Sequence, residues 1–301
     1  MIQQVFARTI RRVNTQAAYD VTIAWLTRNG GAVFERALDA VAAQETARSV
    51  ELLAVDSGST DGTVECLEAH GARVMAIEPA TFDFGTAREQ AFEAARGSVV
   101  VSLSQDAVPA HARWLENLLA PLQEEGVAAS CGRSIPDPDR PEPQFPWERN
   151  GYFYFTAEMR KFRARYGRGL SNANSAIKRA AWERLRFGPQ PIGEDFHFQT
   201  KLHAAGYRIA FPENAPVLHH HNYTTGSLWK RCRNEGLGLR ELGCPYTELD
   251  LLMDLLSPAK YAVWARDLFH GRLTTSASLL FPVLRPWAVY AGSRFGKRYR
   301  P

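Results

Sequence analysis

The chain has 301 residues, which suits one large α/β domain or two modest ones. Hydrophobic residues make up 45% of it and charged residues 23%, so a disordered, collagen-like or coiled-coil protein is excluded. The formal net charge of +4 is too small to indicate a nucleic-acid-binding protein. The four cysteines are scattered without a CxxC pair, which is typical of reduced thiols in a cytosolic protein.

Basic charge concentrates at the C-terminal end of the sequence, where residues 271–301 contain Lys and Arg but no acid. No apolar run approaches the ~20 residues that would cross a bilayer. The nearest candidate, 279–291, is interrupted by Pro282, Arg285 and Pro286. The N-terminal segment also lacks the apolar core of a signal peptide. We therefore expect a soluble cytoplasmic protein, or at most one that lies on the inner face of the plasma membrane.

Strands and helices are predicted to alternate in the first half of the chain. Nearly continuous apolar runs predict strands at 20–27, 50–57 and 97–104. Helical spacing of apolar residues predicts crossover helices at 32–44, 62–70 and 86–96. This alternation favours an α/β fold with a Rossmann-like, mostly parallel sheet flanked by helices. Ligands of such sheets bind at the carboxyl ends of the strands.

The second half begins with a change in composition. The proline-rich segment 134–146 predicts an exposed loop. Beyond it, the patterns predict helices at 178–185 and 194–205 and strand-like runs at 207–211 and 217–218. From 226 to about 270 the pattern is helical and amphipathic.

The sequence lacks the glycine-rich dinucleotide motif, the P-loop, the HExxH zinc motif and the GxSxG elbow. Polar residues instead follow the predicted strands. Asp56 ends the second strand, and its carboxylate could accept hydrogen bonds from a nucleobase or a ribose. Asp and Ser in this segment, DSGSTDGT, equally favour a turn and a helix N-cap. The same two interpretations hold for Thr27, Arg28 and Asn29 after the first strand.

Asp106 follows the third predicted strand, and three consecutive histidines follow the run at 217–218. A divalent ion on a diphosphate needs few protein ligands, so Asp106 could serve with one ligand from elsewhere, or could instead cap a helix. In an extended segment His219 and His221 point one way and His220 the other. The first two could therefore reach a metal ion, or the segment could be a solvated loop with one buried histidine.

Glu194 and Asp195 stand in the first turn of a predicted helix, behind a glycine. Acids are common there because they complement the helix dipole. A carboxylate at the rim of a cleft could also act as a general base toward a hydroxyl. Arg88, on another predicted helix, could meet a phosphate or could simply face solvent.

The order of the motifs resembles family 2 glycosyltransferases of the GT-A fold, most closely the rhamnosyltransferase-like branch that makes bacterial surface polysaccharides. The resemblance covers roughly residues 20–236 and rests on DSGSTDGT, FDFGTAREQA, SQDAVP, SNANSAIKRAAWE, GEDFHFQTKLHAAGYRI and HHHNYT. It implies an inverting transfer from a nucleoside-diphosphate sugar, with rhamnose the best guess. We expect four parts: an N-terminal extension (1–19), the nucleotide-sugar-binding half (20–133) and the acceptor-binding half (134–240) that the resemblance implies, and a basic helical extension (241–301) that the residues themselves indicate.

The resemblance also implies roles for individual residues. Asp195 would be the base, with Glu194 beside it. The nucleotide-sugar site would contain Thr27, Asn29, Asp56, Ser57, Arg88, Gln105 and Asp106. Mg²⁺ or Mn²⁺ would be held by Asp106, His219 and His221, and the acceptor would be bound by Asn172, Asn174 and Trp147. The chain departs from the family's DxD pattern, because Ser104 stands where the other acid is usual.

Several alternatives stay open at this point. The donor could be a dTDP- or UDP-sugar, or the chain could use a UDP-hexose or GDP-mannose. It could also be a catalytically silent, nucleotide-sugar-binding subunit of a polysaccharide assembly complex. The expected acceptor is a glycan or a lipid-linked glycan. The basic C-terminal helices would rest on an anionic membrane, cap the core or form a homodimer contact.

Overall fold

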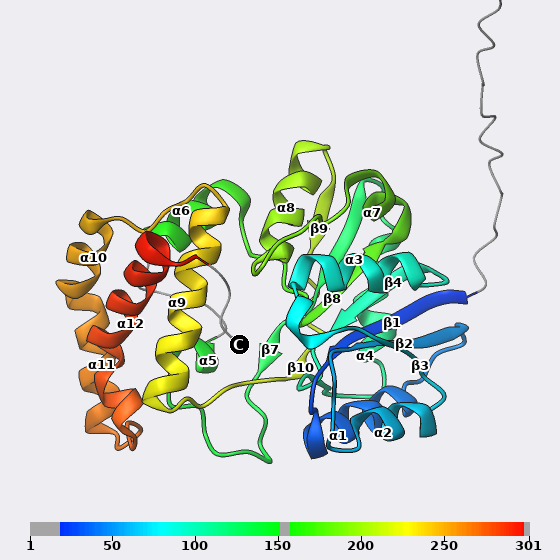
Figure 1. Cartoon of the computed structure of the whole chain (residues 1–301), viewed down its shortest axis with the longest axis horizontal. Helices are drawn as coiled ribbons and strands as arrows, with labels where there is room; N and C mark the ends of the chain where they lie inside the picture. The colour runs from blue at the N-terminus through cyan, green and yellow to red at the C-terminus, as the bar shows by residue number, and fades with distance from the viewer. Residues whose placement is uncertain (1–18, 151–156, 298–301) are drawn as a thin grey trace, which may run out of the picture.

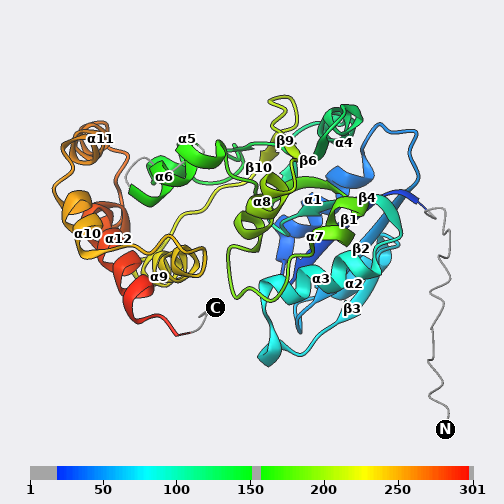
Figure 2. The ribbon, with the colours of Figure 1, turned by 90° about the horizontal axis from the view of Figure 1, so that it is seen from above.

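The computed structural model describes residues 19–150 and 157–297 (Figure 1). Most of the predicted N-terminal extension, 1–18, and the last basic residues, Arg298 and Arg300, lie outside the described residues. A central sheet flanked by helices stands beside a second group of helices that is built mainly from the C-terminal part of the chain (Figures 1 and 2).

The central sheet has seven strands in the order β3-β2-β1-β4-β8-β6-β9. They are β1 (Tyr19–Thr27), β2 (Val50–Asp56), β3 (Arg73–Ala76), β4 (Gly97–Leu103), β6 (Val127–Cys131), β8 (Asn174–Lys178) and β9 (Arg208–Ala210). Only β8 runs antiparallel to its neighbours, β4 and β6. The predicted α/β architecture with a mostly parallel sheet is confirmed, and the three predicted strands match β1, β2 and β4 closely.

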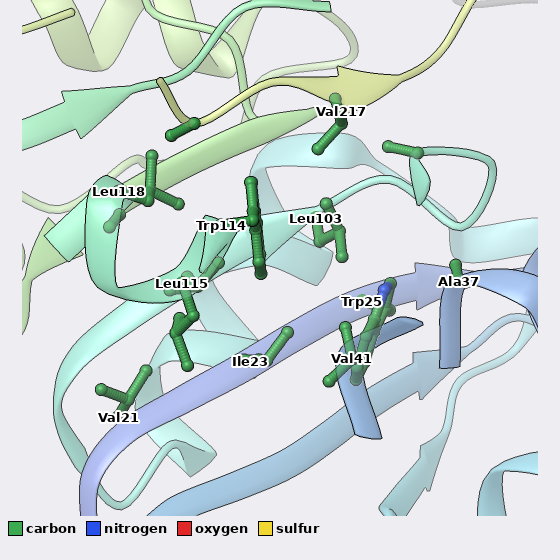
Figure 3. Packing of buried hydrophobic residues seen from close by; sticks show 14 of the residues in the cluster. Val21, Ile23, Trp25, Ala37, Val41, Leu103, Trp114, Leu115, Leu118 and Val217 are labelled. Atoms are coloured by element: carbon green, nitrogen blue, oxygen red, sulfur yellow. The ribbon is translucent and has the colours of Figure 1, made fainter. Parts of the chain in front are cut away.

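Helices cover both faces of this sheet. Successive strand residues point to opposite sides, so the strands place apolar side chains on each face. Ile23 and Trp25 of β1 pack into one core cluster, shown in Figure 3, whereas Ala24 packs into the other. The first cluster is covered by α1 (Gly31–Ala42), α2 (Thr63–Ala69) and α4 (Trp114–Leu119). The second is covered by α3 (Phe84–Ala94), α7 (Arg179–Leu185) and α8 (Glu194–Ala204).

A small second sheet has the order β5-β10-β7. Its strands are β5 (Val108–Pro109), β7 (Ser134–Ile135) and β10 (Val217–Leu218). β10 is antiparallel to β5 and parallel to β7. This arrangement brings the segment after β4 next to the histidines after β10.

The second group of helices has its own apolar core. Its members are α5 (Pro146–Asn150), α6 (Ala157–Tyr166), α9 (Thr225–Glu241), α10 (Glu248–Leu255), α11 (Pro258–Phe269) and α12 (Ser276–Phe295). Phe145 is fully buried in this core, Asp137 is buried as well, and residues 134–135 form β7, so the prediction of an exposed loop over 134–146 is wrong at these positions.

The helices α9 and α12 pack with their backbones in close contact. A Cβ on Gly236 of α9 would lie 1.9 Å from the carbonyl oxygen of Val289, and one on Gly292 of α12 would lie 1.8 Å from that of Arg233. Glycine is therefore required at both positions. The expected boundary at 240 separates these two helices, whereas the structure packs them as one unit.

Helix α12 continues through Pro282 and Pro286, although prolines usually end a helix. Pro286 has no N–H to donate to the carbonyl of Pro282, four residues earlier. The buried ammonium group of Lys260 donates to that carbonyl instead, over 2.7 Å. Among the residues that the structure describes, no helix is both long and apolar enough to cross a membrane.

Candidate active site

The loops after β1 and β2 are fixed to one another around Asp56. Its carboxylate is buried and accepts hydrogen bonds from the Thr27 hydroxyl (2.9 Å), the Ser59 hydroxyl and the N–H groups of Gly58 and Ser59 (2.9 and 2.8 Å). Burial opposes ionisation of Asp56, but these donors outweigh it and lower its pKa. Asp56 therefore fixes the turn, as the second interpretation of this motif expects, and its contact with a nucleoside stays a prediction.

Two more residues of the predicted nucleotide-sugar site belong to the same pair of loops. Ser57 is buried and donates its N–H to the carbonyl oxygen of Thr27 over 2.9 Å. Asn29 has a left-handed φ of 50°, and its side-chain oxygen accepts the N–H of Thr60 over 2.8 Å. The two loops are thus held as one rigid rim at the carboxyl end of the sheet.

Gln105 joins this rim to the loop after β4. Its side-chain oxygen accepts the N–H of Arg28 over 2.9 Å, and its side-chain NH₂ donates to the carbonyl oxygen of Arg28 over 3.1 Å. The side chain therefore pairs with the backbone as a neighbouring strand would. This gives Gln105, the middle residue of the motif that ends at Asp106, a structural role.

The segment before β8 reaches the same edge because β8 is antiparallel to β4. Leu103, at the end of β4, pairs with Asn174 at the start of β8. Just beyond this pair, the N–H of Ser104 donates to the carbonyl oxygen of Ala173 over 3.2 Å. The motif SNANS consequently lies beside the loop that carries Asp106.

Asp106, His219 and His221 form a cluster at this edge. The imidazole Nε2 atoms of His219 and His221 lie 3.3 and 3.7 Å from the two carboxylate oxygens of Asp106. One potential ligand atom from each of the three residues lies within 4.8 Å of the others. His220 points away, as predicted, and its Nδ1 accepts the N–H of Asp137 over 3.0 Å.

The protonation states of Asp106 and His221 suit metal ligands. Burial opposes ionisation of Asp106, yet the hydrogen bond and charge of His219 hold its pKa well below the usual range. Burial, reinforced by the charge of His219, lowers the pKa of His221 to about 4. Ionised carboxylate and neutral imidazole are the forms that bind metals. One carboxylate and two imidazoles fit a divalent cation, with Mn²⁺ better suited to imidazole than the harder Mg²⁺.

The predicted acid pair stands at the start of α8 and is held by Asn172. Glu194 is buried, and its Oε1 accepts the side-chain NH₂ of Asn172 over 3.0 Å. Asp195 is half-buried and accepts the backbone N–H of Asn172 over 3.3 Å and that of Phe196 over 2.8 Å. A single residue thus positions both carboxylates.

Burial and the negative charge of Glu194 raise the pKa of Asp195 to about 7. Arg88 lies behind the pair, with its Nε 3.7 Å from Glu194 Oε1. It is only 5% exposed, so the alternative of a solvent-facing arginine is wrong. Within the described part of the chain its Nε and Nη1 atoms have no hydrogen-bond partner. Arg88 compensates the charge of the acid pair from inside the protein.

The other two predicted acceptor-binding residues are placed differently from Asn172. Asn174 is 1% exposed, and its side chain bonds to Trp114 (3.1 Å) and to the carbonyl oxygen of Ala215 (2.9 Å). Trp147 is buried in the C-terminal core, where its ring stacks on Phe145 with centroids 4.8 Å apart. Both side chains are part of the protein interior, which corrects the expectation that they face an acceptor.

Gln199, which was not predicted as a site residue, supports the acid pair from the same helix. It is fully buried, and its side chain bonds to the backbone of Leu170 (2.7 Å), Tyr166 (3.2 Å) and Arg168 (3.0 Å). The segment before Asn172 is thereby fixed to α8. The signal that could have indicated this role is the position of Gln199 beside the buried Phe198, on the inward face of the helix.

The chain is similar in sequence to two curated rhamnosyltransferases. It is 30% identical over 203 residues to the O-antigen chain rhamnosyltransferase WbaN of Salmonella anatum, a match that spans 64% of each protein. It is 29% identical over 227 residues to the O-antigen chain rhamnosyltransferase RfbN of Salmonella typhimurium, over 72% of this chain and 71% of that protein.

Solved structures share the fold. The mannosyltransferase PcManGT from Pyrobaculum calidifontis, in complex with GDP-Man and Mn²⁺, superposes with a TM-score of 0.60 at 19% identity, over 92% of this chain and 87% of that one. Glucosyl-3-phosphoglycerate synthase from Mycobacterium tuberculosis, in complex with Mg²⁺ and UDP, gives 0.59 at 24% identity, over 76% and 81%. The predicted GT-A fold is confirmed by these likenesses.

A family model described as glycosyl transferase family 2 matches residues 22–186, more than half of the chain. The matched region contains the strand-end loops with Asp56 and Asp106 and the segment with Asn172. Taken with the fold and the site geometry, this match places the chain in glycosyl transferase family 2.

Proposed function

We propose that the protein is an inverting glycosyltransferase of bacterial surface polysaccharide synthesis, which transfers rhamnose from a nucleoside-diphosphate donor to a hydroxyl of a glycan or lipid-linked acceptor. The observation that carries this proposal is Asp195, a half-buried carboxylate whose pKa is raised to about 7. It lies on the edge that the Ser104–Ala173 contact joins to the Asp106 cluster. The similarity to two O-antigen chain rhamnosyltransferases supports the choice of sugar.

In the proposed reaction Asp195 accepts the proton of the acceptor hydroxyl while that oxygen attacks the anomeric carbon of the donor. The attack comes from the face opposite the phosphate oxygen, whose bond to the anomeric carbon breaks. The configuration at the anomeric carbon is therefore inverted. Asn172 holds the carboxylate of Asp195 in place, and Arg88 offsets the charge of Glu194. A divalent cation held by Asp106, His219 and His221 would neutralise the charge of the leaving diphosphate.

The experiment that tests this role replaces Asp195 by Asn. General-base assistance contributes about 10²–10⁴-fold, so we expect kcat to fall by that factor, which is roughly 3–5 kcal/mol of barrier. Donor binding, measured as the thermal shift caused by the nucleoside diphosphate, should be retained. Glu65→Gln is the matched control, because Glu65 is an exposed acid in the first turn of α2. Turnover by Asp195→Asn equal to that of the control would refute the assignment.

The proposed donor is a dTDP- or UDP-sugar. The mannosyltransferase structure with GDP-Man keeps a GDP-sugar as the alternative donor. A thermal-shift comparison of dTDP, UDP and GDP, each with and without Mn²⁺, tests this, because a ligand that binds only the native state raises the melting temperature. Stabilisation by GDP alone would contradict the proposed donor. A catalytically silent subunit would bind a nucleotide but release none from the sugar donor in the presence of acceptor.

We propose further that the C-terminal helices rest on an anionic membrane. Every exposed large apolar side chain among the described residues lies between Trp229 and Phe295. Four of them follow one face of α12, namely Leu279, Leu280, Val283 and Trp287, and are 41–51% exposed. Apolar helix faces in a basic segment suit an anionic lipid surface.

Substitution tests this surface better than truncation, because removing 271–301 would remove the buried side of α12. We expect Leu280→Ser with Trp287→Ser to reduce flotation with anionic vesicles at an unchanged melting temperature. If the wild type and this double variant float equally and the wild type is dimeric in solution, the apolar face of α12 is a dimer contact instead.

A further inference from the structure

A hollow of about 400 Å³ lies between the loop after β7 and helix α11, and holds none of the catalytic candidates. It is lined by Pro136, Glu142, Pro143, Arg149, Arg266 and Arg272. We refer to it as the arginine hollow. Its volume falls within the ~300–1,000 Å³ of typical small-molecule sites.

The three arginines share one buried carboxylate. Asp267 is fully buried and contacts the guanidinium group of Arg149. Its Oδ1 lies 3.4 Å from Arg272 Nη1 and 4.0 Å from Arg266 Nε. Asp267 lies behind the lining, and the acid that lines the hollow itself is the exposed Glu142. Three positive charges thus face two negative ones, and the two acids leave an excess of positive charge.

This excess also acts on Arg149. Its pKa is lowered, first by burial and then by the positive charges of Arg272 and Arg266, in spite of Asp267. Its Nη1 donates to the carbonyl oxygen of Pro143 over 3.0 Å, so its guanidinium group is fixed in orientation. The side chains of Arg266 and Arg272 are 58% and 43% exposed and stand at the opening. One fixed and two accessible guanidinium groups form the donor arrangement that binds phosphate oxygens.

We infer that the arginine hollow binds a phosphate or diphosphate group. An anion there would neutralise the positive charge of the three guanidinium groups that Asp267 and Glu142 leave uncompensated. The ligand is distinct from the diphosphate of the sugar donor, because the lining residues are separate from the Asp106 cluster.

The hollow nevertheless adjoins the candidate active site through the backbone. Pro136 lines it, and the preceding residue, Ile135, accepts the N–H of His219 at its carbonyl oxygen over 2.9 Å. A phosphate in the hollow would therefore lie beside the strand pair that carries a candidate metal ligand. If the proposed transferase function holds, this phosphate belongs to the acceptor rather than to the donor.

The apolar surroundings favour a lipid as the carrier of this phosphate. Phe269 lies three residues after Arg266 at the end of α11, so the two side chains project from the same side of the helix. Phe269 is 89% exposed. A phosphate that bears an apolar chain would meet both the guanidinium groups and this side chain. A water-soluble phosphate compound would use only the guanidinium groups.

Calorimetric titration with inorganic pyrophosphate, in EDTA to remove divalent cations, tests the site. We expect the double variant Arg266→Gln, Arg272→Gln to bind pyrophosphate at least tenfold more weakly than wild type. Both side chains are half-exposed or nearly so, so the fold should be retained, as an unchanged melting temperature would verify. Arg184→Gln, an exposed arginine on α7, is the matched control and should bind as wild type does. Equal affinity of all three proteins would overturn the inference.

A second titration identifies the carrier and separates this site from the donor site. Farnesyl diphosphate should bind at least tenfold more tightly than pyrophosphate, and Phe269→Ser should remove the difference. Equal binding of both probes would overturn the lipid carrier in favour of a water-soluble phosphate. Pyrophosphate bound to wild type should persist when the nucleoside diphosphate saturates the protein in Mn²⁺, and its displacement would refute a separate site. Stabilisation by nucleoside diphosphate and Mn²⁺ reports the proposed transferase site independently of both titrations.

Discussion

Asp195 owes its raised pKa first to burial and then to the negative charge of a neighbouring carboxylate. Glu194 places a second carboxylate beside it, whereas the N–H groups of Phe196 and Asn172 and the charge of Arg88 favour its ionised form. Burial and Glu194 outweigh these three contributions. The result is a carboxylate that changes its charge near neutral pH, which is where a general base works best.

The pH dependence of kcat/KM should reflect this titration. Asp195 accepts a proton only when ionised, so kcat/KM should rise with pH through about 7 and then level off. Glu194→Gln removes the neighbouring negative charge, so the midpoint should move to lower pH. Steady-state rates between pH 5.5 and 9 would measure the midpoints of the wild type and of Glu194→Gln, with Glu65→Gln as control. A midpoint that Glu194→Gln leaves in place would argue against Asp195 as the titrating group.

The orientation of the three consecutive histidines was predicted correctly because its signal depends only on local sequence. Alternation in an extended chain is enough to predict that His219 and His221 point the same way. The burial of Arg88 and Asn174 depends on elements far away in the sequence. Arg88 meets Glu194 of α8, and Asn174 meets Trp114 of α4. No pattern in the local sequence predicts these contacts.

Among the elements, strands were predicted more accurately than C-terminal helices. β1, β2 and β4 are buried on both faces, so each is a continuous apolar run with clear ends. Helix α12 was predicted only as an unspecified part of the helical extension over 241–301, because Pro282 and Pro286 suggest an interruption. What permits the continuous helix is a tertiary contact, the ammonium group of Lys260 at the carbonyl of Pro282.

Replacing Lys260 by Met tests this explanation. Lys260 is 1% exposed and also contacts the carbonyl oxygen of Asp254, so the substitution leaves two buried carbonyl groups without this donor. Each unsatisfied buried group costs about 1–3 kcal/mol, so for two groups we expect the free energy of unfolding to fall by roughly 2–6 kcal/mol. Urea denaturation measures it. Lys230→Met, at an exposed position of α9, is the control, and equal stability of the two variants would contradict the explanation.

At the scale of the whole molecule, the chain has two surfaces with different chemistry. The edge of the central sheet gathers carboxylates and histidines on loops that are bonded to one another from Asp56 to Asp195. The C-terminal helices hold the exposed apolar faces and the arginine hollow. The first surface could be predicted from motif order. The amphipathic pattern of the C-terminal helices led to the expectation of a membrane contact, but the arginine hollow could not be predicted, because it depends on how α11 packs against the loop after β7.

The central claim is that one edge of the sheet holds both the cation and the base. The most direct measurement is a crystal structure with Mn²⁺ and the nucleoside-diphosphate sugar, in which the anomalous signal locates the manganese. We predict a single strong peak bonded to Asp106 and to His219 or His221, with the anomeric carbon of the sugar facing Asp195. Manganese bound elsewhere, or a donor whose anomeric carbon faces away from Asp195, would contradict the account.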